Sequence, residues 1–506
     1  MEQLSPLDAA FLEIEDEDPH AALSIASVAV LEGPAPDQRD FVAAFTARLP
    51  MIPHSRQKIR HIPFDLGPPV WVDDAHFDAA RHVKRIAAPA PGGETDLCAL
   101  VSMIMAERLD RNRPLWECWV IEGLAEGRWA ILSKVHHCLA DGVSGNALHE
   151  RVFTRAPPAI GRTSDVTAEP GTVELVLNAV RGFATSPLDE LAALVRNLFP
   201  PTRLARRVTD TAHGLGAVAA ALIPVARSSL SGPIGTQRRY ELAHVSLPEV
   251  REIARTFQVT INDVVLAAIT GAFRDLLLRR GEHPTAKTLR TLVPVSVRTE
   301  HDNTVDNRIS LLLPLLPVDV ADPVRRLAAV HRRLTALKNG HEAEAGPAMT
   351  ASAGHVPFAP IAWGVRAAAR LPQHVIVTVA TNIPGPRHLL SMLGRDIIEL
   401  YPYVPIALRL RTGVAVLTYR DRMTFGITAD LDSAPETPFL ADAIENDIAA
   451  LATSARNPNG PHSKDLRPLA DENSSGKRSG HGTKSTVDDG TRPRPGRQHH
   501  TRTGSA

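Results

Sequence analysis

Ile131-Leu-Ser-Lys-Val-His-His-Cys-Leu-Ala-Asp-Gly-Val-Ser-Gly-Asn146 is the stretch that decides the fold, because it places two adjacent histidines directly after a short apolar run. The run from Ile131 to Val135 suits a buried strand, and Asp141-Gly142 is a turn dipeptide. The apolar residues between Ala147 and Val152 recur at helical spacing. The stretch therefore predicts a strand, a turn and a helix, with the polar chemistry at the turn.

His136 and His137 are expected at the point where the buried strand ends. Successive side chains of a strand point to opposite faces of a sheet, so one histidine should face an open cleft and the other should face into packing. This arrangement predicts one base and one structural partner.

The composition limits the classes of partner. A chain of 506 residues should hold two or more domains, and its 56 basic residues equal its 56 acidic ones, so no net field recruits nucleic acid. The three cysteines fit neither a metal site nor a disulfide framework, which favours a reducing, cytoplasmic setting. The N-terminus lacks the pattern of a signal peptide, and no uncharged apolar stretch reaches the roughly 20 residues that span a bilayer. Any membrane contact is expected to be peripheral.

Residues 1–155 mix strand-like and helical patterns and are interpreted as an N-terminal domain. Residues 23–31 have strand character, and residues 95–109 form an amphipathic helical pattern. The segment 111–124 reads as a strand entered through a proline, and we expect it to be an antiparallel neighbour of the histidine strand.

The rest of the chain divides into three parts. Residues 156–236 are interrupted by prolines and are interpreted as a helical crossover. Residues 237–455 again mix helical and strand patterns, with a helix start at Thr260-Ile-Asn-Asp263. Residues 456–506 are polar and basic, which is typical of a disordered tail. Both halves combine sheet with helix, so the sequence predicts an α/β fold of two layered α+β domains.

A histidine pair followed by an aspartate can belong to three classes of site. Zinc binding lacks further ligands at suitable spacing, and a nucleophile elbow of the G-x-S-x-G type is missing. A pairing of Cys138 with His137 is poor because adjacent strand residues diverge. The remaining chemistry is a lone general base that takes a proton from a bound hydroxyl or amine. Taken alone, the motif fits two histidines buried for packing equally well, and Asp141 could be a helix cap or an ion-pair partner.

The segment His136-His-Cys-Leu-Ala-Asp-Gly142 matches the H-H-x-x-x-D-G motif of the CoA-dependent acyltransferase superfamily. The flanking blocks resemble the bacterial wax ester synthase/diacylglycerol acyltransferase family and run in family order from residue 4 to about residue 455. They are Leu4-Ser-Pro-Leu-Asp-Ala-Ala-Phe-Leu12, Arg113-Pro-Leu-Trp116, Gly232-Pro-Ile-Gly235, Val259-Thr-Ile-Asn-Asp-Val-Val265, Val293-Pro-Val-Ser-Val-Arg298, Asn307-Arg308 and Thr381-Asn-Ile-Pro-Gly-Pro386. Asp306 and Thr381 depart from the residues that are usual in the family.

The resemblance implies two chloramphenicol-acetyltransferase-like domains with the active site in a tunnel at their interface. It assigns the general base to His137, which would activate the acceptor hydroxyl for direct attack on an acyl-CoA thioester without an acyl-enzyme. The residues that it assigns to structural support of the site are His136, Asp141, Gly142, Asn262, Asp263 and Arg298. For Asp263, a helix cap is the stronger interpretation.

The expected activity is an acyl-CoA:diacylglycerol O-acyltransferase that forms triacylglycerol, with wax ester synthesis from long-chain alcohols as an extension. Acyl-CoA is expected as a co-substrate, with no cofactor and no metal. The interpretation also allows peripheral association with the inner membrane face or with lipid droplets. Two alternatives stay open: a polyketide-ester or condensation-type transferase whose donor is bound to a carrier protein, and a catalytically silent lipid-binding relative.

Overall fold

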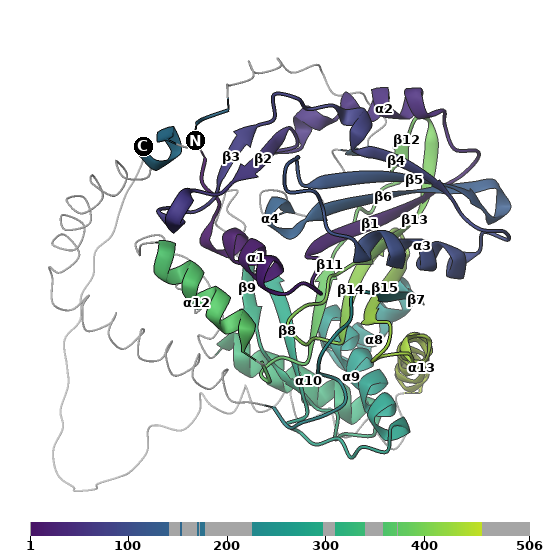
Figure 1. Ribbon diagram of the computed structural model, residues 1–506. Helices are drawn as coiled ribbons and strands as arrows, with labels where there is room; N and C mark the ends of the chain where they lie inside the picture. The colour runs from purple at the N-terminus through teal and green to yellow at the C-terminus, as the bar shows by residue number, and fades with distance from the viewer. Residues whose placement is uncertain are drawn as a thin grey trace, which may run out of the picture. The chain divides into compact units, whose positions relative to one another are not determined.

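Two mixed β-sheets with helices packed on them make up the computed structural model (Figure 1). The structure describes residues 2–140, 152–153, 169–171, 173–177, 225–296, 309–339, 358–371 and 373–457. Most of the helical crossover predicted at 156–236 and nearly all of the disordered tail predicted at 456–506 lie outside these residues. Within the described ranges, no helix combines the length and the apolar character needed to cross a membrane.

The first sheet has the strand order β12-β13-β1-β6-β5-β4. Its strands are β1 (Ser24–Leu31), β4 (Val83–Ala87), β5 (Trp116–Leu124), β6 (Arg128–His136), β12 (Ser391–Met392) and β13 (Arg395–Tyr403). The strands β5 and β6 pair antiparallel, with Trp116 opposite Val135, which confirms the neighbour relationship expected from the sequence. A separate two-stranded sheet joins β2 (Gln57–Arg60) to β3 (Val70–Asp73).

The second sheet has the strand order β10-β8-β11-β14-β15-β7, with β9 paired to β8. Its strands are β7 (Arg238–Ser246), β8 (Leu289–Ser296), β9 (Ile309–Leu312), β10 (Leu315–Leu316), β11 (Thr378–Ile383), β14 (Thr412–Tyr419) and β15 (Arg422–Asp430). The strands β14 and β15 form an antiparallel hairpin, with Tyr419 opposite Arg422.

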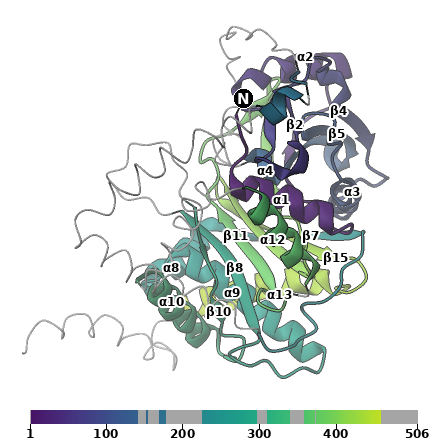
Figure 2. The ribbon, with the colours of Figure 1, turned by 60° about the vertical axis from the view of Figure 1, so that its left-hand side comes forward.

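The helices divide between the two halves of the chain (Figures 1 and 2). The α-helices are α1 (Pro6–Glu17), α2 (Gln38–Thr46), α3 (Glu94–Ala106), α4 (His137–Ala140), α8 (Leu247–Phe257), α9 (Ile261–Arg279), α10 (Pro323–Asn339), α12 (Phe358–Arg370) and α13 (Thr437–Arg456). Short 3₁₀ turns are η1 (Leu49–Met51), η2 (Pro63–Asp65), η3 (Ala79–Arg81) and η4 (Ala125–Gly127). The helices α8, α9, α10 and α13 pack together, and α9 and α13 also contact strands of the second sheet.

Polar side chains fix the ends of two helices near the histidine strand. Ser5 begins α1, because its side chain accepts the N–H of Asp8 and Pro6 occupies the first helical position. Lys134 of β6 is almost fully buried, and its Nζ donates to the carbonyl oxygens of Ile104 at 2.8 Å and Glu107 at 2.6 Å. These carbonyls lie at the C-terminal end of α3, where a cation is favourable.

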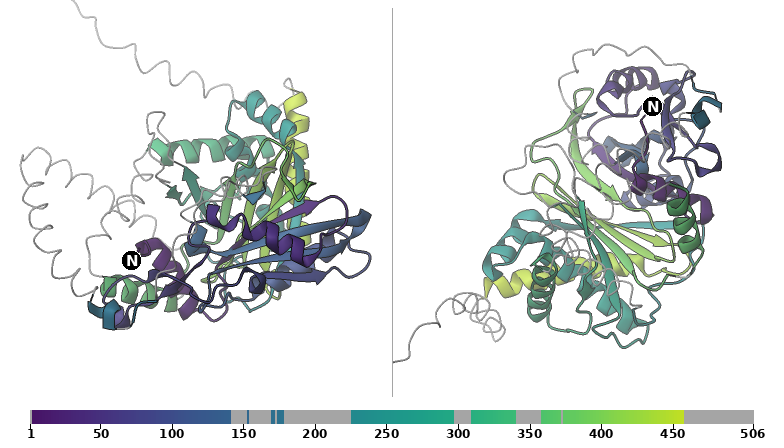
Figure 3. Two further views of the ribbon diagram at one scale, coloured as in Figure 1. Left: turned by 90° about the horizontal axis from the view of Figure 1, so that it is seen from above. Right: turned by 90° about the vertical axis from the view of Figure 1, so that its left-hand side faces the viewer.

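The strand β13 belongs to the C-terminal half of the chain but completes the first sheet. It lies between β12 and β1, with Tyr401 opposite Val28, and Figure 3 shows its yellow-green ribbon beside the purple N-terminal strands. Its Pro402 carbonyl accepts the hydroxyl of Tyr240 from β7 at 2.7 Å. The two halves are therefore joined by main-chain pairing, while the domain boundaries expected from the sequence stay predictions.

Candidate functional site

The two histidines lie where β6 ends and α4 begins. His136 is the last residue of β6 and is fully buried, whereas His137 is the first residue of α4 and is partly exposed. The sequence predicted this division into a packed and an accessible histidine. It placed the following turn at Asp141-Gly142, but a helical turn already begins at His137.

Local hydrogen bonds explain the early helix start. The N–H of His137 donates to the carbonyl of Leu23 at 2.9 Å, and the N–H of Cys138 donates to His136 Nδ1 at 3.2 Å. These bonds provide partners for the first amide groups of the helix, which have none within it. Asp141 and Gly142 lie outside the described residues, and so does Arg298.

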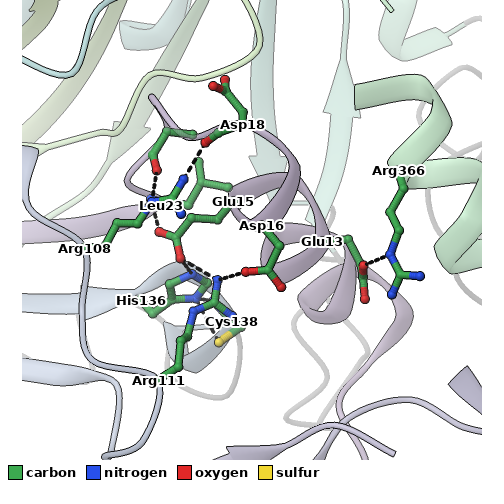
Figure 4. A network of polar contacts seen from close by, with 11 residues as sticks. Glu13, Glu15, Asp16, Asp18, Leu23, Arg108, Arg111, His136, Cys138 and Arg366 are labelled. Atoms are coloured by element: carbon green, nitrogen blue, oxygen red, sulfur yellow. Dashed lines mark hydrogen bonds and ion pairs between the residues drawn. The ribbon is translucent and has the colours of Figure 1, made fainter. Parts of the chain in front are cut away.

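The buried His136 ring has a polar neighbour at each of its nitrogens, a hydrogen bond at Nδ1 and the Glu15 carboxylate near Nε2. Because Nδ1 accepts a backbone N–H, the ring proton belongs on Nε2. Nε2 lies 3.4 Å from Glu15 Oε2, and Glu15 is itself only 1% exposed (Figure 4). Burial lowers the pKa of His136, although the Glu15 carboxylate acts in the opposite direction.

Three groups surround the carboxylate of Glu15. Besides facing His136, it lies 2.5 Å from the guanidinium of Arg111, and its Oε1 accepts the N–H of Leu23 at 2.7 Å (Figure 4). Burial alone would raise the pKa of Glu15, but His136, Arg111 and the Leu23 N–H together lower it to about 2. The carboxylate is therefore charged throughout the physiological range.

The His137 ring stacks on Phe11 of α1. The ring centroids are 3.9 Å apart and the planes are inclined by 26°. Burial, followed by the neighbouring His136, lowers the pKa of His137 to about 4. At neutral pH the imidazole is therefore uncharged and has a nitrogen lone pair with which to accept a proton.

Cys138 takes a place that the sequence did not predict. The sequence predicted a strand residue whose side chain diverges from that of His137. Cys138 lies instead in α4, where its Sγ is 2.9 Å from His136 Nδ1. The helical turn brings the side chain back toward the preceding residues. Burial raises the pKa of the Cys138 thiol, so the group is a neutral thiol rather than a nucleophilic thiolate.

The Asn-Asp pair lies at the start of α9, on the second half of the chain. Asp263 closes a capping box with Thr260, accepting its N–H at 2.8 Å and donating its own N–H to Thr260 Oγ1 at 3.2 Å. Asp263 Oδ2 also lies 2.8 Å from His331 Nδ1, and Asn262 Oδ1 lies 3.5 Å from the amide of Asn382. Asp263 thus has the capping role predicted by the Thr260-x-x-Asp263 spacing.

The structure therefore brings His136 and His137 together and supplies two neighbours that sequence reasoning did not assign, Phe11 and Glu15. They lie one helical turn apart on α1, with Phe11 inside the block Leu4–Leu12 and Glu15 just after it. Their i, i+4 spacing places them on one face of α1 but does not indicate which segment that face contacts. The catalytic role expected for His137 and the supporting roles expected for the other residues stay predictions.

Comparison with protein families identifies two matching segments. Residues 4–265 match the wax ester synthase/diacylglycerol acyltransferase catalytic domain, and residues 305–452 match the C-terminal domain of the same family. These matches confirm the resemblance that the sequence motifs indicated.

Relatives and solved structures agree with the family match. The chain is 46% identical to a protein of Mycobacterium tuberculosis named probable diacylglycerol O-acyltransferase tgs1, over 90% of this chain and 97% of the relative. A wax ester synthase/diacylglycerol acyltransferase from Marinobacter aquaeolei aligns with a TM-score of 0.61 and 24% identity, over 90% of this chain and 99% of that one. The first condensation domain of the calcium-dependent antibiotic synthetase aligns with a TM-score of 0.55 and 15% identity, over 91% of this chain and 98% of that domain. The structural likenesses confirm the α/β two-domain fold.

Proposed function

Since the chain belongs to the wax ester synthase/diacylglycerol acyltransferase family, we propose that it transfers a long-chain acyl group from acyl-CoA to the hydroxyl of diacylglycerol. The products are triacylglycerol and free CoA. Long-chain alcohols are the second class of acceptor and give wax esters. The name of the mycobacterial relative supports the diacylglycerol acceptor, and the family description covers both acceptors.

The single observation that carries the proposal is a neutral, partly exposed histidine whose ring stacks on Phe11. In the proposed reaction, a ring nitrogen of His137 takes the proton of the acceptor hydroxyl while its oxygen attacks the thioester carbonyl. The carbon–sulfur bond then breaks, and the proton passes from His137 to the departing CoA thiolate. A thioester is an activated acyl donor, so positioning and one base are sufficient.

We propose that His136 supports this base through its position and not through proton transfer. Its Nδ1 accepts the Cys138 N–H, and its Nε2 faces Glu15, so neither ring nitrogen is free to meet a substrate. Asp141, Gly142, Asn262, Asp263 and Arg298 remain proposed structural supports. Acyl-CoA enters as a co-substrate, and the proposed chemistry requires no cofactor.

We further propose that the protein works in the cytoplasm and binds peripherally to the inner membrane face or to lipid droplets. Diacylglycerol is insoluble in water and must be taken from a lipid surface. Two exposed aromatic side chains support this proposal: Phe64 is 86% exposed and Trp363 is 61% exposed. The indole N–H of Trp363 donates to Asp65, the residue after Phe64, at 3.1 Å. Tryptophan with an apolar body and a satisfied polar edge is typical of membrane interfaces.

The proposed reaction is tested by purified wild-type protein and His137→Gln, assayed with palmitoyl-CoA and three acceptors: diacylglycerol, hexadecanol and water. We expect His137→Gln to lower transfer by about 10²-fold or more, the usual contribution of a general base. His283→Gln, an exposed histidine after α9, is the matched control and should retain wild-type turnover. Full turnover by His137→Gln would refute the proposed base. Failure of free palmitoyl-CoA where a carrier-bound acyl donor succeeds would instead favour the condensation-type alternative.

A further inference from the structure

The helix α1 presents two residues to the histidine pair. Phe11 and Glu15 are one helical turn apart, so their side chains leave the same face of α1. Phe11 meets His137 and Glu15 meets His136, so residues on two successive turns of α1 contact the two adjacent histidines.

Phe11 contacts the proposed base directly. A stack with a centroid separation of 3.9 Å fixes the plane of the imidazole and covers one of its faces. Phe11 itself packs against a small buried apolar cluster from both halves of the chain, formed by Ala21, Leu23 and Ala407. The Phe11 ring on which the His137 ring stacks is therefore fixed in place.

Glu15 acts on both histidines by separate routes. Its Oε2 faces the His136 ring, and its Oε1 accepts the N–H of Leu23. The carbonyl of the same Leu23 accepts the N–H of His137 at 2.9 Å. One carboxylate thus fixes the ring of His136 and, through a single residue, the backbone at His137.

The burial of Glu15 needs an explanation beyond packing. A buried carboxylate with a cation partner is commonly neutral or unfavourable for stability compared with apolar residues of similar volume. The contacts of Glu15 join three segments: the loop before β1, the loop before β5 that carries Arg111, and the end of β6. These are the segments that have to be aligned around the histidine pair.

We infer that Phe11 and Glu15 are positioning residues of the transferase site, Phe11 for the ring of His137 and Glu15 for the His136 ring and the backbone at His137. The inference rests on the proposed function. It assigns the N-terminal helix α1 a part in the active site, although neither residue bears a group that reacts with the substrates.

The test for Phe11 compares Phe11→Leu, which keeps apolar bulk, with Phe11→Tyr, which keeps the ring. We expect Phe11→Leu to lower kcat by about 10-fold or more with little change in KM for palmitoyl-CoA, and Phe11→Tyr to restore turnover. Phe11→Leu should also move the acid limb of the kcat/KM profile upward, toward the ordinary histidine pKa of about 6.5. The titratable groups facing this site are His136 on β6, Glu15 on α1 and Arg111 before β5, and all are kept in both variants.

The test for Glu15 uses Glu15→Gln and Glu15→Asp, with Asp16→Asn as the matched control. Asp16 lies on the same helix and contacts the same Arg111 at 3.2 Å, but its side chain is 50% exposed. We expect both Glu15 variants to lose kcat, with KM for palmitoyl-CoA nearly unchanged, while Asp16→Asn behaves as wild type. Should Glu15→Gln fail to fold, Glu15→Asp keeps the charge but withdraws it from His136. Wild-type kcat in a folded Glu15 variant would overturn the inference for this residue.

A readout that does not depend on turnover separates the inference from the proposed function. The NMR resonances of ¹³C-labelled His137, assigned by their loss in His137→Gln, should be shifted upfield by the Phe11 ring in the wild type and in Phe11→Tyr. Phe11→Leu should remove this shift. A wild-type protein without transferase activity would refute the proposed function. An active wild type whose His137 resonances and kcat are the same in Phe11→Leu would overturn the positioning role of Phe11.

Discussion

The guanidinium of Arg370 on α12 donates to both carboxylate oxygens of Glu17 on α1, at 2.7 and 3.0 Å. One helical turn earlier, Arg366 of α12 pairs with Glu13 of α1. The two helices, which lie side by side in Figure 2, therefore match two ion pairs at the same i, i+4 spacing. These ion pairs hold α1 by the face that points away from the histidines.

Removal of Arg366 should destabilise the protein much more than removal of Arg370. Arg366→Ala leaves the nearly buried Glu13 carboxylate without its cation and also breaks two hydrogen bonds to Asp65, so we expect a loss of roughly 2 kcal/mol in the free energy of unfolding. Arg370 is 71% exposed, and Arg370→Ala should change the stability little. Urea denaturation of both variants checks the difference, and equal losses would contradict it.

The stability should fall in mild acid because His137 is held neutral. Its pKa of about 4 in the folded protein is below the ordinary value of about 6.5 in the unfolded chain. Between these values the unfolded chain binds more protons, so stability rises with pH and is lost as the pH falls from 6.5 toward 4. When the pH falls from 6.5 to 5, the free energy of unfolding of His137→Gln should therefore fall by about 2 kcal/mol less than that of the wild type. Denaturation of both proteins at the two pH values measures this difference. Parallel losses in the two proteins would show that His137 does not have this lowered pKa.

The close approach of β13 to β15 should depend on Gly426. A Cβ at this position would be 1.9 Å from the carbonyl oxygen of Pro402 and 2.8 Å from the hydroxyl of Tyr240. Gly426→Ala is therefore expected to cost about 3 kcal/mol or more, because the main chain of Pro402 has to move. Gly364→Ala, in the open part of α12, meets nothing within 4 Å and should stabilise the protein by about 0.5–1 kcal/mol. Thermal unfolding of both variants tests whether the two changes in stability have opposite signs. A Gly426→Ala protein as stable as wild type would refute the role of Gly426.

The exposed aromatic residues should determine binding to lipid. We expect Phe64→Ser combined with Trp363→Ser to lower binding to phosphatidylcholine vesicles containing diacylglycerol by about 10-fold, since each side chain buries apolar area in the bilayer surface. The control is the double variant Met103→Ser and Leu278→Ser, whose residues are 52% and 44% exposed on α3 and α9. Turnover on a water-soluble short-chain alcohol should be retained. Unchanged vesicle sedimentation of the aromatic variant would exclude this surface as the lipid contact.

The parts of the fold that follow from local pattern were predictable from the sequence. The apolar run before His136 predicted the buried strand, and Thr260-x-x-Asp263 predicted the start of α9. One packed and one accessible histidine were also predicted, although the change from strand to helix at His137, and not the alternation of strand faces, separates them. Each of these depends on neighbours within a few residues.

The rest depends on contacts between distant segments. Glu15 meets His136, and Phe11 meets His137, only after α1 has packed against α4, and a mixed pattern of acidic and apolar residues does not reveal such a partner. The assignment of Cys138 to a strand was wrong because α4 begins at His137, immediately after β6 ends at His136. Phe11 lay in a family block, but a motif alone does not say which side chain it contacts.

The pairing of β13 with β1 also bears on how the chain is made. Ribosomal synthesis releases β1, β5 and β6 well before Arg395–Tyr403, so the nascent first sheet has β1 as an open edge with unpaired amide and carbonyl groups. The N-terminal half cannot finish folding by itself during translation, and it exposes a surface able to pair with other chains until β13 arrives. Expression of the first half alone should accordingly yield an aggregation-prone product, and supplying the second half in the same cell should relieve it.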